Sequence, residues 1–243
     1  MMTAPYLENL RDHFYDQMDQ STSAWLFGSA VTGDWVPGRS DLDLLMVIPK
    51  ERLASFGAKV RAWARTPSNP ILDGYVFVVS ESSPMLLPLE PFANVACPSG
   101  TRIEIIDQWY IKNRSKHLFG SESFGKNFAD VTIDELRRWA FTNLQMLSNG
   151  TTSARRSTIS NLIWTTSWAA RMLMLSKGNV CESKQEALRW LASENEEIRD
   201  VVNILLENFY KTDVEPTSVT LEQSLELGEF CIELARREIQ PQL

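Results

Sequence analysis

The chain has 243 residues and a formal net charge of −7, with 44% hydrophobic and 10% aromatic residues, a composition typical of a folded globular protein. The acidic balance argues against bulk nucleic acid as a substrate, because nucleic-acid-binding domains usually carry a basic face, and it suits a cationic partner. No apolar run approaches the roughly 20 residues that a membrane helix needs, so no membrane anchor is expected.

Cysteine usage and the N-terminal sequence predict a cytoplasmic protein. The three cysteines, Cys97, Cys181 and Cys231, are odd in number and lack the spacing of a metal site, which is typical of reduced thiols. The first residues carry neither the basic nor the apolar region of an export signal. Monomer and dimer are both left open by the sequence.

The first half of the chain alternates between helix and strand patterns. Apolar residues at helical spacing predict an N-terminal helix over residues 6–19 and an amphipathic helix over 50–65. Apolar strands are predicted at 25–27 and 44–48, and a third strand at 71–79.

Two further segments in this half have weaker patterns. The three prolines within residues 85–100 predict a loop, with a short strand near 94–97. Residues 102–117 are predicted to begin as a strand and to continue as a helix.

From Ile133 onward the pattern is helical throughout. Five helices are predicted, over residues 133–147, 157–175, 183–192, 196–210 and 221–239. The expected N-caps are Thr132 or residues 151–153, then Ser183 and Thr220, and Gly178 with Asn179 is the expected C-cap of the longest helix. The predicted fold class is therefore α+β, with a mixed-sheet domain over residues 1–125 and a helical-bundle domain over residues 126–243.

The segment with the clearest chemical meaning joins the first two strands. The second strand opens with Asp41 and Asp43, whose side chains would project from the same face. Two carboxylates aimed at one point repel each other unless a cation lies between them, and oxygen ligands favour Mg²⁺. Gly28 permits close approach of a backbone, and Ser29 adds a hydroxyl beside the amides of the following turn, where phosphate oxygens can bind. Together these residues predict a site for a metal-bound nucleoside triphosphate.

These residues resemble the signature of the nucleotidyltransferase superfamily. The surrounding Phe-Gly-Ser-Ala-Val-Thr-Gly and Ser-Asp-Leu-Asp-Leu-Leu are most similar to the aminoglycoside adenylyltransferases of the streptomycin/spectinomycin type. Residues 112–120 and 171–190 resemble later segments of that family. The resemblance implies a polymerase-beta-like nucleotidyltransferase domain ahead of the helical domain, with Mg²⁺ as cofactor and ATP as co-substrate.

A third carboxylate is expected from the strand after the metal-binding one. The resembled enzymes place a glutamate there, opposite Tyr75 in this sequence, whereas Asp73 lies two residues earlier on the same face. Asp73 is therefore the candidate for a catalytic or metal-binding role. The alternative is that Asp73 and Gly74 form a two-residue hairpin turn. Glu81 and Glu104 are more distant candidates.

Several further residues are candidates for binding the nucleotide. The resemblance implies that Arg171 and Lys184 bind the triphosphate, although each could be an ordinary helix charge. Ser40 either contacts phosphate or caps the turn before Asp41. Trp35 lies in the loop between the glycine–serine pair and the aspartates, where an exposed ring could shield the nucleotide or contact substrate.

The leading hypothesis is transfer of AMP from ATP to a hydroxyl of a small, cationic molecule, most plausibly an aminoglycoside. The residues that could form the acceptor pocket, 89–100 and 148–156, show no clear counterpart of the resembled enzymes' pocket, so the acceptor could differ from streptomycin or spectinomycin. One alternative is a nucleotidyltransferase that modifies a protein or tRNA, as in toxin–antitoxin pairs. The other is a regulator that binds nucleotide without catalysis, which would apply if Asp73 pointed away from the metal.

Overall fold

The computed structural model describes residues 4–14, 22–38, 40–79, 85–88, 103–122, 128–148 and 159–209, with a few positions between 226 and 237. The chain divides into two compact units, Met1–Asp130 and Val131–Leu243. The predicted strand near residues 94–97 lies outside the described residues, and only scattered helical positions of the predicted helix over 221–239 are described.

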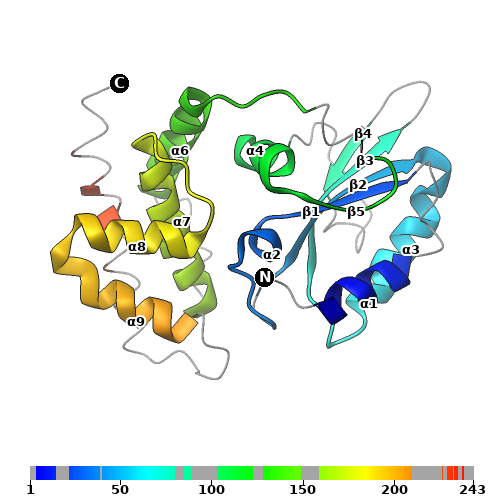
Figure 1. Ribbon diagram of the computed structural model, residues 1–243, viewed down its shortest axis with the longest axis horizontal. Coiled ribbons are helices and arrows are strands. Elements are labelled where there is room, and N and C mark those ends of the chain that lie inside the picture. The colour runs from blue at the N-terminus through cyan, green and yellow to red at the C-terminus, as the bar shows by residue number, and fades with distance from the viewer. Residues whose placement is uncertain are drawn as a thin grey trace. The chain divides into compact units, whose positions relative to one another are not determined.

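The first unit is built on a five-stranded mixed sheet in the order β4-β3-β2-β1-β5 (Figure 1). Its strands are β1 Ser23–Phe27, β2 Leu42–Pro49, β3 Leu72–Val79, β4 Met85–Pro88 and β5 Lys116–Phe119. Only the pairing of β2 with β3 is parallel among these neighbours, and the other three pairings are antiparallel. The predicted α+β class with a mixed sheet is therefore confirmed.

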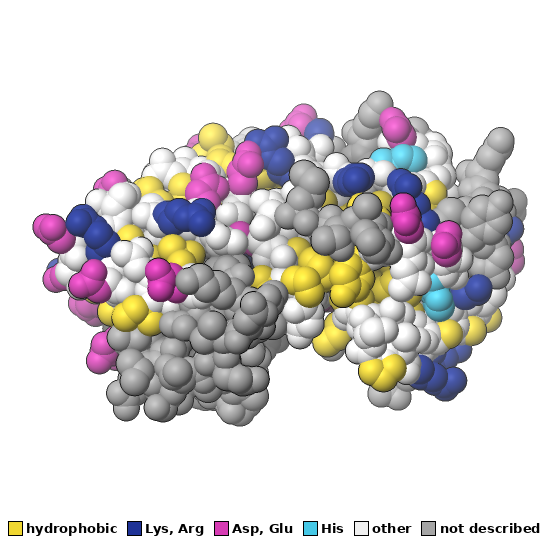
Figure 2. Space-filling view, turned by 60° about the horizontal axis from the view of Figure 1, so that its bottom comes forward, with side chains coloured by type: hydrophobic (Ala, Val, Ile, Leu, Met, Phe, Trp, Pro, Cys, Tyr) yellow, Lys and Arg dark blue, Asp and Glu magenta, His cyan; other side chains and the backbone are white. Residues whose placement is uncertain are grey.

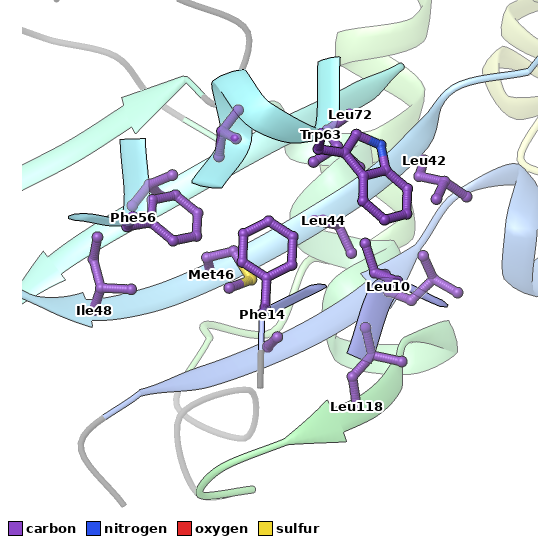
Figure 3. Packing of buried hydrophobic residues seen from close by; sticks show 14 of the residues in the cluster. Leu10, Phe14, Leu42, Leu44, Met46, Ile48, Phe56, Trp63, Leu72 and Leu118 are labelled. Carbon is purple, nitrogen blue, oxygen red and sulfur yellow. The ribbon is translucent and has the colours of Figure 1, made fainter. Parts of the chain in front are cut away.

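Alternation along the strands separates the two faces of the sheet. One face carries the even-numbered apolar side chains of β2 and β3, which pack against α1 (Ala4–Phe14) and α3 (Leu53–Ala64). Figure 3 shows this core, in which Phe14 and Phe56 lie 5.6 Å apart between ring centroids. The core side chains labelled in the figure are Leu10, Phe14, Leu42, Leu44, Met46, Ile48, Phe56, Trp63, Leu72 and Leu118. Because successive side chains point to opposite faces, the odd-numbered residues of β2 and β3 face away from this core.

Three further helical elements belong to the first unit. The four-residue helix α2, Ser29–Thr32, follows β1 directly, and the short 3-10 helix η2, Lys50–Arg52, leads into α3. The helix α4, Ile105–Arg114, lies on the face of the sheet opposite α1 and α3 (Figure 1). A hydrogen bond from Tyr75 of β3 to Asp107 of α4 holds this helix to the sheet.

Two expectations for this unit are wrong. A strand, β4, occupies residues predicted as loop, because it pairs with β3 through Tyr75 to Val78. The segment predicted to run from strand to helix has the opposite order: α4 comes first, and β5 follows it. An edge strand of four residues is too short for its own periodicity to be recognised, and pairing with β1 makes it a strand.

The second unit is helical in its described residues. Its elements are α6 Ile133–Ser148, α7 Ile159–Ser176, α8 Lys184–Glu194, the 3-10 helix η5 Glu196–Ile198 and α9 Arg199–Phe209. Consecutive helices pack against one another, α6 with α7, α7 with α8 and α8 with α9. Among the described residues, no helix combines the length and apolar character needed to cross a membrane.

The caps predicted at Thr132, Ser183 and Gly178 are confirmed, whereas the N-cap candidates at residues 151–153 and Thr220 lie outside the described residues. The Glu135 N–H donates to Thr132 Oγ1 over 3.2 Å, and the Glu186 N–H donates to Ser183 Oγ over 3.0 Å, so each hydroxyl satisfies an amide of the first turn. At the end of α7, the Gly178 N–H donates to the Leu175 carbonyl, which closes the helix as a C-cap.

Candidate active site

Three carboxylates meet at the head of β2. Asp43 and Asp73 lie opposite each other in the parallel pairing of β2 with β3, and Asp41 precedes β2 by one residue. Carboxylate oxygens of the three residues lie within 4.8 Å of one another. Asp41 is exposed, whereas Asp43 and Asp73 are half-buried. The sheet therefore brings together, on one face, the three leading acid candidates of the sequence analysis, whereas Glu104 is not part of this group and Glu81 lies outside the described residues.

The structure excludes the hairpin alternative for Asp73. Asp73 and Gly74 both lie inside β3, which runs without interruption from Leu72 to Val79. The Gly74 N–H donates to Asp73 Oδ1 over 2.6 Å, so the strand's own backbone orients this carboxylate. A Cβ on Gly74 would overlap the Leu44 carbonyl oxygen, which shows how closely the backbones of β2 and β3 approach at this level.

Gly28 follows the last residue of β1 and lies directly beside the carboxylate cluster. It has a φ of 63°, in the left-handed region that favours glycine, and its carbonyl accepts the N–H groups of Val31 and Thr32 at the start of α2. A Cβ at this position would overlap the Asp43 Oδ2 atom. The turn thus requires glycine twice, for its backbone angle and for the space that Asp43 occupies.

Two serines flank the cluster. The Ser29 hydroxyl oxygen is buried and has no hydrogen-bond partner among the described residues. Since a buried polar atom is normally paired, an oxygen or donor of a bound ligand would meet this requirement. The Ser40 hydroxyl accepts the Val36 N–H over 3.0 Å, which is the turn-capping role that the sequence left as one of two possibilities. A hydroxyl that accepts a hydrogen bond retains its own O–H for donation.

Trp35 differs from its expected role. We predicted an exposed ring that could cover a nucleotide, and the structure buries it, with 7% of the residue exposed. Its ring packs edge-on against Tyr6, with 5.1 Å between centroids. The indole N–H donates to the Asp41 carbonyl oxygen over 3.1 Å. The expectation was wrong because the loop folds inward onto the core of the sheet.

A second polar group lies on the same face of β3, one pleat beyond Asp73. The Tyr75 hydroxyl donates to Asp107 over 2.8 Å and accepts the Glu104 N–H over 3.3 Å. Burial, and then the negative charge of Asp107, raise the pKa of Tyr75 well above its usual range. Its ring stacks on Phe27, with 6.4 Å between centroids. The sequence analysis missed Asp107, although an acid in the first turn of a helix facing the sheet was a usable signal.

The two cations implied by the resemblance lie in the second unit. Arg171 is half-buried on α7, between Ala170 and Met172, which are fully buried, and Lys184 is the first residue of α8. Their role toward a triphosphate stays a prediction.

The carboxylate cluster suits a divalent cation. Three ionised acids within 4.8 Å repel one another, and a cation between them removes that cost. All the donors in this group are carboxylate oxygens, the ligand type that Mg²⁺ prefers. The buried, unpaired Ser29 hydroxyl, at the start of the turn whose Gly28 abuts Asp43, is a further group that a bound phosphate would satisfy.

Comparison with known proteins agrees with this geometry. Residues 7–83 match the family model described as a nucleotidyltransferase domain. A solved structure described as spectinomycin adenyltransferase AAD(9) from Enterococcus faecialis with ATP and spectinomycin aligns with a TM-score of 0.62 and 14% identity, covering 96% of this chain and all of that one. At this identity the match shows a shared fold.

A second solved structure, a STING-associated CdnE c-di-GMP synthase from Capnocytophaga granulosa, aligns over 99% of this chain and 84% of that one at 14% identity. Its TM-score of 0.32 is too low to support an argument. No curated protein sequence matches the chain. The matched segment contains Gly28, Ser29 and all three clustered aspartates. Residues 7–83 are thus similar to nucleotidyltransferase domains, which supports a transferase enzyme, and the fold resembles that of the solved spectinomycin adenyltransferase.

Proposed function

We propose that the chain transfers AMP from ATP to a hydroxyl of a small molecule, with Mg²⁺ held by Asp41 and Asp43. The observation that carries this proposal is the meeting of three carboxylates beside the Gly28–Ser29 turn. It favours a catalyst over a regulator that only binds nucleotide, because that alternative required Asp73 to point away from the other two acids.

Different residues are proposed to bind the cation and the phosphates. Asp41 and Asp43 hold the cation, and the turn at Gly28 and Ser29 receives phosphate oxygens, with the Ser29 hydroxyl as one partner. Ser40 is a further phosphate contact through its own O–H. Bound Mg²⁺ would supply charge neutralisation for the triphosphate and for the leaving pyrophosphate.

The reaction is an in-line displacement. The acceptor hydroxyl oxygen bonds to the α-phosphorus of ATP, and the bond from that phosphorus to the β-phosphate oxygen breaks, so pyrophosphate leaves. The hydroxyl proton must go to a base, a role that we assign to Asp73. Two contacts support this role: the Gly74 N–H orients the Asp73 carboxylate through Oδ1, and a carboxylate oxygen of Asp73 lies within 4.8 Å of those of Asp41 and Asp43.

The acceptor is proposed to be an aminoglycoside or a related hydroxylated cation. Support comes from the fold shared with a spectinomycin adenyltransferase solved with ATP and spectinomycin, and from the net charge of −7, which favours a cationic ligand. Acidic and basic side chains lie interspersed over the described part of the face in Figure 2. Arg171 and Lys184 are proposed as the cations that neutralise the triphosphate, which predicts that their alanine variants raise the KM for ATP.

The function can be tested by incubating the protein with ATP, Mg²⁺ and a panel of aminoglycosides, and by following pyrophosphate release and the mass of each acceptor. Release that depends on one acceptor, with a mass gain equal to AMP less one water, supports the proposal. Transfer of labelled AMP to a protein or tRNA from a lysate, with no panel member modified, would favour the macromolecular alternative. Nucleotide binding without any transfer would favour the regulator.

A further inference from the structure

We propose that Trp35 is a positioning residue of the metal site, fastening the phosphate-binding turn to the first metal-binding carboxylate. This inference rests on the proposed function, because it assigns a part in cation binding to a residue that touches neither cation nor nucleotide. It adds a role for a buried ring that the reaction itself does not use.

The contacts of Trp35 join the two halves of the site. Its main-chain N–H donates to the Ser29 carbonyl over 3.1 Å, and its indole N–H donates to the Asp41 carbonyl over 3.1 Å. One residue therefore holds the backbone of the proposed phosphate turn at one end and the backbone of a proposed metal ligand at the other. A shift of Trp35 would change the spacing between the two.

Core packing fixes the position of the ring. Trp35 belongs to the buried cluster between the sheet and helices α1 and α3, and Tyr6 of α1 meets it edge-on. Close-packed interiors leave little room for a side chain of this size to move. The indole N–H therefore has a fixed position, and its hydrogen bond restrains the position of the Asp41 carbonyl.

Asp41 needs such a support more than Asp43 or Asp73 does. Those two residues lie inside β2 and β3, where the parallel pairing sets their backbones. Asp41 precedes the first residue of β2 and is exposed. The inter-strand bond nearest to it runs from the Leu42 N–H to the Ile71 carbonyl. The hydrogen bond from the indole N–H extends the restrained backbone by one residue, from Leu42 to Asp41, the proposed metal-binding residue.

Cation binding is the direct test, with Mn²⁺ as the probe and a non-hydrolysable ATP analogue present, measured by electron paramagnetic resonance. The variants are Trp35→Phe and, to keep the ring shape, Trp35 replaced by 3-benzothienylalanine, in which a sulfur atom takes the place of the indole N–H. Trp63→Phe is the matched control, since Trp63 is a buried tryptophan whose indole N–H donates to the Pro70 carbonyl over 2.7 Å. Thermal unfolding of each variant gives the loss of Tm that the substitution causes.

A positioning role predicts that both Trp35 replacements weaken Mn²⁺ binding by about tenfold or more, the usual effect of removing a group that orients a ligand, while Trp63→Phe leaves it unchanged at a similar loss of Tm. Equal affinities for the Trp35 and Trp63 variants would overturn the inference and leave the proposed function intact. Failure of the unmodified protein to bind Mn²⁺ with the nucleotide would overturn the proposed function instead.

Discussion

Gly28 and Asp43 share one small volume: a Cβ on the glycine would overlap the aspartate's Oδ2 atom. The two residues come from neighbouring strands, since Gly28 follows β1 and Asp43 pairs with Phe27, the last residue of β1. The absence of a side chain at position 28 therefore gives the Asp43 carboxylate its place beside the turn. This relationship makes the glycine part of the metal site, and not only of the turn.

Gly28→Ala is expected to abolish cation and nucleotide binding, because the methyl group displaces the Asp43 carboxylate. The control is Gly38→Ala, where φ is 74° and no atom lies within 4 Å of the added Cβ. Both residues have a positive φ, so each variant carries backbone strain, and the strain at Gly28 is about 1–3 kcal/mol because its φ of 63° with ψ of −147° is close to a region that essentially only glycine adopts. Only Gly28→Ala also has the overlap with Asp43. Calorimetric titration with MgATP and thermal unfolding would separate the two effects. Equal binding by both variants would show that the Asp43 position does not depend on the glycine.

Asp73→Asn is expected to lower turnover by about a hundredfold or more, as for loss of a general base, with a smaller change in the KM for ATP. The same variant should raise the Tm of the metal-free protein, because it removes one of three like charges within 4.8 Å. Asp200→Asn, at an exposed position on α9, is the control for the loss of one acid. An unchanged rate in Asp73→Asn would assign the proton transfer elsewhere.

Tyr75→Phe is expected to cost about 1–3 kcal/mol of stability, since Asp107 loses a hydrogen bond at a partly buried position. Cation binding should remain, because the hydroxyl belongs to the link between β3 and α4. In the native protein, burial and the Asp107 charge raise the pKa of Tyr75. Asp107→Asn should therefore lower that pKa, as read from the ultraviolet absorbance of phenolate. A Tyr75→Phe variant that folds normally but binds no Mn²⁺ would place the hydroxyl in the metal site.

The cap of α6 predicts a pH dependence. The Thr132 N–H and hydroxyl both donate to Glu135 over 2.8 Å, and these bonds lower the pKa of the Glu135 carboxyl. A lowered folded-state pKa gives stability that is present above the unfolded value of about 4.3 and is lost as the pH falls through the folded value. The Tm difference between the native protein and Glu135→Gln should therefore shrink on acidification. A constant difference down to about pH 2 would contradict this assignment.

Local pattern predicted the parts of the site that lie along one stretch of chain. An apolar run headed by Asp41 and Asp43 can bury its alternate side chains only as a strand, and a glycine–serine pair after a strand indicates a turn. The structure has both, with the turn at Gly28 leading into α2.

The other features of the fold and the site depend on contacts between residues that lie far apart in the sequence. That Asp73 faces Asp43 follows from the parallel register of β2 with β3, which no local pattern specifies. Trp35 was expected to be exposed because it lies in a loop, and its burial depends on α1 packing over that loop through Tyr6. Residues 116–119 form the strand β5 because they pair with the edge of β1.

Cation binding by the carboxylate cluster tests the account most directly. Mn²⁺ binding in the presence of a non-hydrolysable ATP analogue should be detected in the native protein and lost in Asp41→Asn and in Asp43→Asn, with both variants as thermally stable as the native chain. Binding of equal affinity in the native protein and in the two variants would contradict the assignment of the metal to these acids.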